Sequence, residues 1–194
     1  VRRRGLGVLP WTPEAQKLRQ RVQFLRALTG GEALWPDWSD AALLATLEDW
    51  LAGWLNGMSR LTHLQRLDMA QVLNSLLSYE AQTRLREWAP ETYRVPSGSQ
   101  VPIDYSAPEC PVLAVKLQEL FGLTQTPCIA AGQVPLLLHL LSPARRPVQI
   151  TRALAGFWAG SYAEVKKELK GRYPKHPWPD NPLTAAPTRW TKPR

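Results

Sequence analysis

Residues 136–182, LLLHLLSPARRPVQITRALAGFWAGSYAEVKKELKGRYPKHPWPDNP, join an apolar run, an Arg-Arg turn, a basic aromatic helix and a Pro-rich exit. Lys166, Lys167 and Lys170 lie between the apolar positions of that helix, and Gly171 is placed to end it. We therefore expect one amphipathic helix with a cationic outer face. Its apolar residues recur at spacings of three and four: Leu154, Phe157, Trp158, Tyr162, Val165 and Leu169.

Toward the N-terminus, short segments of alternating or β-branched residues are separated by Pro, Gly and Ser. The first two segments flank Pro-Ser-Gly-Ser, which predicts a hairpin. Three strands, a short helix at 117–123 and two more strands follow the order of an OB-type barrel. Residues 91–180 are thus predicted to form a small β-rich, OB-like unit closed by the last helix. We expect these five strands at residues 92–95, 101–105, 112–116, 128–130 and 134–141, and residues 146–150 are a further candidate for extended structure.

The first 90 residues carry helical signals. Thr12 and Pro13 predict a helix start, and apolar residues at helical spacing follow up to Gly30. Ser39 and Ser59 are expected to cap two further helices, the second of which continues or kinks into residues 79–88. The overall prediction is an α+β chain: an N-terminal helical bundle at 1–90, the β-rich unit at 91–180 and a flexible tail at 181–194.

The positive charge is concentrated at the C-terminal end. The formal net charge is +8, and residues 141–194 alone account for that value. Two cysteines without a CxxC pair favour a reducing compartment, and the longest apolar run, residues 134–141, is too short to span a bilayer. We expect a cytoplasmic protein without membrane insertion. Because the chain begins with Val-Arg-Arg-Arg and no initiator Met, we also expect it to be part of a larger protein.

Motifs for catalysis are missing from the sequence. A phosphate-binding GxxxxGK[ST] loop does not occur, no serine lies in a GxSxG elbow, and Cys110 and Cys128 form no metal cluster with the histidines. His176 lies in Lys-His-Pro-Trp, where neighbouring cations would lower its basicity, although a solvated loop histidine is the simpler interpretation. We predict no catalytic residue and no metal or cofactor site in these 194 residues.

Cations interleaved with aromatic residues indicate nucleic-acid binding, because cations bind phosphates and exposed rings stack on unpaired bases. The alternative is that the lysines only solvate a docked helix and that the aromatic residues form a clasp. The candidate nucleic-acid-binding residues are Arg145, Arg146, Arg152, Lys166, Lys167, Lys170, Arg172, Tyr173, Lys175 and Trp178.

Several blocks resemble the C-terminal region of the bacterial HrpB-type ATP-dependent helicases, a DExH-box, superfamily 2 family. The resemblance covers nearly the whole chain except the final tail. It is carried by LPWTPEAQKLRQRVQFLR at 9–26, WPDWSDAALLATLEDWL at 35–51, LQRLD at 64–68, VPSGSQVPIDYS at 95–106, PVLAVKLQELFGL at 111–123, VPLLLHLLSPARRPVQIT at 134–151 and LAGFWAGSYAEVKKELKGRYPKHPWPDNP at 154–182.

The resemblance implies that ATP and Mg²⁺ are bound by two RecA-like motor domains of the parent protein, whose motifs do not occur here. The chain is then expected to be a non-catalytic accessory module that helps to hold single-stranded RNA or DNA. A second hypothesis is a protein-interaction or scaffold module that docks on the motor domains or on an outside partner. Its motivation is the tryptophans next to prolines, which could anchor an interface: Trp11, Trp35, Trp38 and Trp178.

Overall fold

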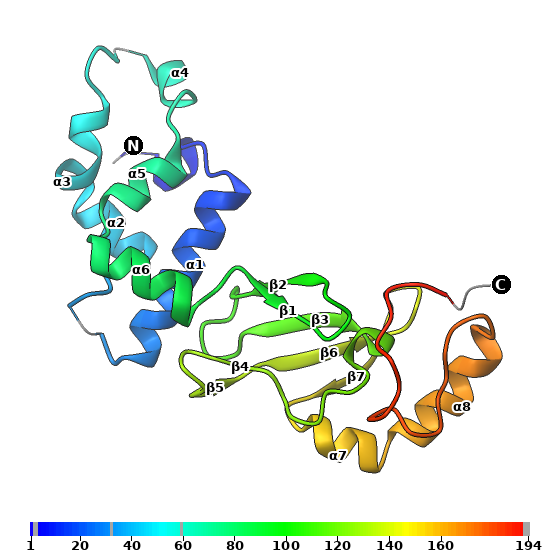
Figure 1. Ribbon diagram of the computed structural model, residues 1–194. Helices are drawn as coiled ribbons and strands as arrows, with labels where there is room; N and C mark the ends of the chain where they lie inside the picture. Colours follow the sequence, from blue (N-terminus) through cyan, green and yellow to red (C-terminus); the bar gives the residue numbers. More distant parts are fainter. Residues whose placement is uncertain (2–3, 32, 59, 192–194) are drawn as a thin grey trace. The chain divides into compact units, whose positions relative to one another are not determined.

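The structure is a computed structural model that describes residues 1, 4–31, 33–58 and 60–191. It is α+β, and the chain divides into two compact units (Figure 1). The helical unit comprises Val1–Ala89 with Tyr105–Glu109, and the sheet unit comprises Pro90–Asp104 with Cys110–Arg194.

The helical unit is built from short helices around α1 (Pro13–Leu28). The predicted start of α1 is confirmed, because the Thr12 side chain accepts a hydrogen bond from Ala15 N at 3.2 Å and Pro13 occupies the first turn. The other helices are α2 (Asp40–Ala45), α3 (Leu47–Leu51), α4 (Leu61–Leu64), α5 (Met69–Ser75) and α6 (Tyr79–Trp88), with 3₁₀ turns η1 (Leu6–Val8) and η2 (Ala52–Trp54).

The two later helices predicted for this unit are each divided into shorter ones. The helix that starts after Ser39 stops at Thr46, where α2 ends, and α3 and η2 continue it. Ser59 lies outside the described residues. A new helix, α5, begins at Met69 after the N-cap residue Asp68, whose carboxylate accepts hydrogen bonds from the backbone N–H groups of Ala70 and Gln71, both at 3.0 Å. Such local caps end one helix and start the next, so the expected bundle of long helices is not confirmed.

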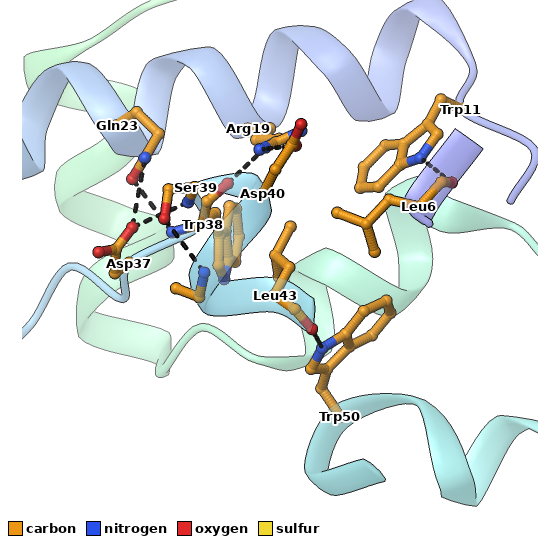
Figure 2. A network of polar contacts seen from close by, with 11 residues as sticks. Leu6, Trp11, Arg19, Gln23, Asp37, Trp38, Ser39, Asp40, Leu43 and Trp50 are labelled. Atoms are coloured by element: carbon orange, nitrogen blue, oxygen red, sulfur yellow. Dashed lines mark hydrogen bonds and ion pairs between the residues drawn. The ribbon is translucent and has the colours of Figure 1, made fainter. Parts of the chain in front are cut away.

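Polar side chains of α1 hold the segment that leads into α2 (Figure 2). Arg19 donates from Nε to Trp38 O at 2.5 Å and from Nη2 to Asp40 Oδ1 at 2.6 Å. One turn along the helix, Gln23 Oε1 accepts a hydrogen bond from Trp38 N at 3.1 Å. Both backbone polar groups of Trp38 are therefore satisfied, which allows its ring to be buried.

The sheet unit contains a five-stranded mixed sheet in the order β1-β2-β3-β6-β7 (Figure 1). The predicted hairpin is confirmed as the antiparallel pair β1 and β2. At the centre, β3 and β6 are parallel, with Ala114 opposite His139. The strands are β1 (Thr92–Arg94), β2 (Gln100–Asp104), β3 (Val112–Lys116), β6 (Leu137–Leu141) and β7 (Pro147–Thr151), and β4 (Cys128–Ile129) and β5 (Val134–Pro135) form a separate ribbon.

The predicted single strand at 134–141 is divided at Leu136. Leu136 N still bonds to Pro127 O, on the side of β4, whereas Leu137 N bonds to Pro111 O, on the side of β3, both at 2.9 Å. The backbone thus changes partner within one residue, and β5 and β6 belong to different sheets. Within the described part of the chain, β1 and β7 each pair on one side only, so the sheet is open and the OB-like barrel is not confirmed.

One face of the sheet is fully buried and the other is partly open. Leu113 and Val115 of β3 and Leu138 and Leu140 of β6 are at most 2% exposed. Because side chains alternate along a strand, Ala114 and Lys116 point to the opposite face, where Ala114 is exposed. The outer face thus includes Lys116, the last residue of β3.

The predicted last helix is two helices, α7 (Leu154–Ala159) and α8 (Tyr162–Arg172). Between them Gly160 has φ −115° and ψ −85°, outside the helical region. A Cβ at Gly160 would lie 3.3 Å from Gly156 O, so the bend leaves little room for a side chain. The segment predicted as a short helix at 117–123 forms the 3₁₀ helix η3 (Leu117–Leu120).

Hydrogen bonds attach the chain after α8 to η3. The side chain of Gln118 donates from Nε2 to Thr188 O and Trp190 O, each at 3.1 Å, and Thr188 N donates to Gln118 O. Gly122 N donates to Pro182 O at 2.9 Å. These contacts involve residues of the expected flexible tail at 181–194, whose mobility stays a prediction.

Candidate nucleic-acid interface

The Arg-Arg turn connects β6 and β7 and presents two exposed cations. Arg145 has a positive φ of 60°, and its N–H donates to Ser142 O at 2.8 Å. Ser142 is 2% exposed and also binds Arg146, by donating to its carbonyl and by accepting its N–H at Oγ. The turn is therefore fixed by Ser142, and Arg145 and Arg146 are both exposed.

Arg152 is not part of the same group. Arg152 comes directly after β7, and Arg146 comes directly before it. Because β7 has five residues, its two ends lie roughly 16 Å apart. The Arg152 guanidinium lies 2.7 Å from Cys110 Sγ, and its carbonyl accepts the hydroxyl of Thr126 at 2.7 Å. These contacts give Arg152 a local structural role.

The lysines of α8 differ in their surroundings. Lys166 forms an ion pair with Asp180, and its side chain is only 17% exposed. The hydrogen bond and charge of Lys166 lower the pKa of the Asp180 carboxyl. The charge of Lys170 also lowers this pKa, by a smaller amount. Lys166 therefore ties the Pro-rich segment to α8, whereas Lys167 and Lys170 are exposed. Arg172 has Glu168 at 3.4 Å on the same helix.

The two candidate aromatic residues form a clasp. Trp178 donates from Nε1 to Tyr173 O at 2.8 Å, and the Tyr173 ring meets the His176 ring edge to face at 6.2 Å. Both Tyr173 and Trp178 are half-buried, and Lys175 between them is exposed. The contacts support the clasp interpretation for the rings, while base stacking on them stays a prediction.

His176 is held by η3 and is not a solvated loop residue. Because Gln118 uses its amide N–H groups for Thr188 and Trp190, its Oε1 is left as the acceptor for His176 Nδ1 at 2.8 Å. Burial, followed by the positive charge of Lys116, lowers the pKa of His176 below its ordinary value of 6.5.

This lowered pKa predicts a pH dependence of folding. The unfolded chain binds the proton at His176 more readily than the folded chain does, so the stabilising contribution is present above pH 6.5 and is lost as the pH falls below it. Urea unfolding at about pH 7 and about pH 5 measures this loss. His176→Asn keeps a donor for Gln118 but cannot titrate, and we expect a smaller loss in that variant. Equal losses in both proteins would contradict the assignment.

Two cations that the sequence did not indicate lie close to Arg145. Lys116 is the last residue of β3, and Arg189 belongs to the segment after α8. Together with Arg145 they line a cavity of about 370 Å³ on the outer face of the sheet. We call it the basic cavity. The position of Lys116 at a strand end was visible in the sequence, but nothing there related Arg189 to the sheet.

The tryptophans proposed as interface anchors are mostly internal. Trp35 is fully buried and Trp38 is 2% exposed, so the structure contradicts an anchoring role for these two. Trp11 donates from Nε1 to Leu6 O at 2.9 Å and is half-buried. The exposed ring is that of Trp190, at 76%. Of the four proposed anchors, Trp35 and Trp38 thus belong to the core, and Trp11 and Trp178 are half-buried.

Residues 50–182 match the family model described as ATP-dependent helicase C-terminal, and the chain belongs to this family. It is 50% identical over 192 residues to the ATP-dependent RNA helicase HrpB of Escherichia coli strain K12, covering 99% of this chain and 24% of that protein. The resemblance found in the sequence is thereby confirmed.

Solved structures agree with this assignment. The crystal structure of the E. coli DExH-box NTPase HrpB matches with a TM-score of 0.89 and 50% identity, over 98% of this chain and 23% of that one. The crystal structure of the Escherichia coli DEAH/RHA helicase HrpB matches with a TM-score of 0.74 and 48% identity, over 91% and 22%. The chain thus spans about a quarter of the length of these relatives.

No helix among the described residues is long and apolar enough to cross a membrane. Within the same ranges, no three His, Cys, Asp or Glu side chains gather where they could hold a metal ion.

Proposed function

We propose that this chain is a non-catalytic C-terminal accessory module of an ATP-dependent RNA helicase and that it contributes to RNA binding. In this proposal ATP and Mg²⁺ act in RecA-like motor domains of the parent protein, against which the module docks in the cytoplasm. RNA is favoured over DNA because the similar HrpB protein is named an RNA helicase. The observation that carries the proposal is the concentration of the whole net charge of +8 in residues 141–194.

The exposed cations of this region are suited to phosphate binding. Lys167, Lys170 and Lys175 project from α8 and from the segment that follows it, and Arg145 and Arg146 project from the turn. Free lysines bind phosphates as mobile point charges, and each phosphate that is neutralised releases counterions. Lys166 is excluded from this set because its charge is used by Asp180.

Fluorescence anisotropy with a labelled single-stranded RNA tests the proposal. We expect binding at about 50 mM salt that weakens steeply as salt is added, with a slope of about −0.7 per neutralised phosphate. Charge reversal in Lys167→Glu, Lys170→Glu and Lys175→Glu together should weaken binding by about tenfold or more. The same reversals at Lys17, Arg60 and Arg66, which are exposed in the helical unit, are the control. No measurable binding by the unmodified chain at low salt would contradict the proposal.

A further inference from the structure

The outer face of the sheet is hollowed where β3 and β6 end. The basic cavity lies here, with Pro102 of β2 and Ala114 of β3 on its floor. Its volume of about 370 Å³ falls within the range of small-ligand sites, which is roughly 300–1,000 Å³. A cavity of this size accommodates a phosphate group together with part of its nucleotide.

Three cations reach this cavity from three separate segments: Lys116 from β3, Arg145 from the turn and Arg189 from the chain after α8. Within the described residues, none of these side chains forms an ion pair, in contrast to Lys166 and Arg172. The guanidinium of Arg189 lies over the β1–β2 hairpin, since a Cβ at Gly98 would be 3.3 Å from its Nη2. The side chains of Lys116, Arg145 and Arg189 are therefore placed at the cavity by the segments that carry them and not by ion pairs with acidic residues.

One carboxylate also lines the cavity, but its charge is used within the protein. Glu119 is 9% exposed, and its Oε2 accepts hydrogen bonds from the hydroxyls of Ser97, at 2.8 Å, and Ser99. These bonds fix the hairpin turn and stabilise the carboxylate without a cation. Three cations against one hydrogen-bonded carboxylate leave the cavity positive.

We infer that the basic cavity binds a phosphodiester group of single-stranded RNA. Arginine is suited to this task because its planar fork donates two parallel hydrogen bonds to phosphate oxygens, and here Arg145 and Arg189 face one cavity with Lys116 as a third donor. His176 of the clasp is hydrogen-bonded to Gln118, and the next residue, Glu119, lines the cavity. This inference rests on the proposed function and assigns it a specific phosphate site.

The test compares two sets of neutral substitutions in the 194-residue chain. In Lys116→Gln, Arg145→Gln and Arg189→Gln the cavity loses three charges, and in Lys17→Gln, Arg60→Gln and Arg66→Gln the helical unit loses the same number. We expect the cavity variant to bind labelled RNA about tenfold or more weakly at ~100 mM salt, and its salt slope to fall by about 2. The control variant should stay within about twofold. Equal binding by the two variants would overturn the inference and leave the proposed function intact.

A second measurement does not depend on RNA. Pyrophosphate is titrated into the isotopically labelled chain, and the amide shifts of Gly98 and Ala114 are followed by NMR. We expect both amides to shift in the unmodified chain and not in the cavity variant. If RNA does not bind but these amides shift, the proposed function and the inferred RNA site both fail, and only anion binding by the cavity remains. If RNA binds but these amides do not shift, the inference fails and the proposed function stands.

Discussion

Replacement of Arg21 by alanine is expected to destabilise the helical unit by about 3 kcal/mol. Arg21 lies on α1 with only 6% of its surface exposed. It donates from Nε to Ala89 O at 2.6 Å and from Nη2 to Leu85 O at 3.3 Å. Both acceptors lie at the C-terminal end of α6, where Ala89 is the C-cap residue. Leu85 O also accepts the N–H of Ala89 at 3.1 Å, so Arg21 adds a second donor there.

Three effects add in this variant. The carbonyls of Leu85 and Ala89 lose a charged donor in a buried place, which costs more than a neutral hydrogen bond on the surface. The positive charge also stabilises the negative end of the α6 dipole, and its loss removes this contribution. In addition, the buried stem of the arginine leaves a void between α1 and α6.

Urea unfolding followed by far-UV circular dichroism measures the change. Arg86→Ala removes an arginine from the exposed surface of α6 and should alter the free energy of unfolding by no more than about 0.5 kcal/mol. Arg21→Lys keeps the charge but cannot reach two carbonyls in the same geometry, so we expect an intermediate loss. A loss in Arg21→Ala as small as in Arg86→Ala would show that the buried bonds contribute little.

Arg21 also illustrates what could not be read from the sequence. Within the helix pattern of residues 12–28 it counts as one more polar residue, and no local signal separates it from half-buried Arg26 or exposed Lys17. Its partner carbonyls lie more than 60 residues away. The start of α1 at Thr12 was predictable because capping needs only residues within one turn of each other.

The same distinction between local and distant contacts holds for the sheet. The β1–β2 hairpin and β3 were predictable from short turns and alternation. The parallel pairing of β3 with β6 was not, because its residues are separated by about 25 positions and the apolar run at 134–141 gives no sign of a break at Leu136. The OB-type barrel predicted from the order of these segments is consequently not confirmed.

For the candidate site, the sequence showed where the positive charges are concentrated but not which of them are paired within the protein. Lys166, Lys167 and Lys170 are equivalent in the sequence pattern, yet Asp180 pairs with the first of them. Conversely, Lys116 and Arg189 are far apart in the chain and meet at one cavity. Tertiary contacts decide which cations remain available for a ligand. The resemblance to helicases indicated the class of protein but not which cations pair with acidic residues.

Replacement of Trp158 by alanine is expected to destabilise the sheet unit by about 3–5 kcal/mol. Trp158 of α7 is 8% exposed and lies in an aromatic cluster, with ring centroids 5.1 Å from Phe157, 5.4 Å from Tyr162 and 6.2 Å from Phe121. Its Nε1 donates to Leu123 O at 2.8 Å. The cluster joins η3, α7 and α8, so the truncation removes packing from all three elements.

Trp158→Phe separates the two contributions of this side chain. Phenylalanine keeps most of the ring contacts and loses the hydrogen bond to Leu123, so we expect a loss of only about 1–2 kcal/mol. Trp190→Ala is the matched control, because that ring is 76% exposed and its truncation should cost less than about 0.5 kcal/mol. Thermal and urea unfolding of the three variants measure these differences. If Trp158→Ala and Trp190→Ala lose the same stability, the aromatic cluster does not hold α8, and the placement of Lys167 and Lys170 then depends on the Pro-rich clasp alone.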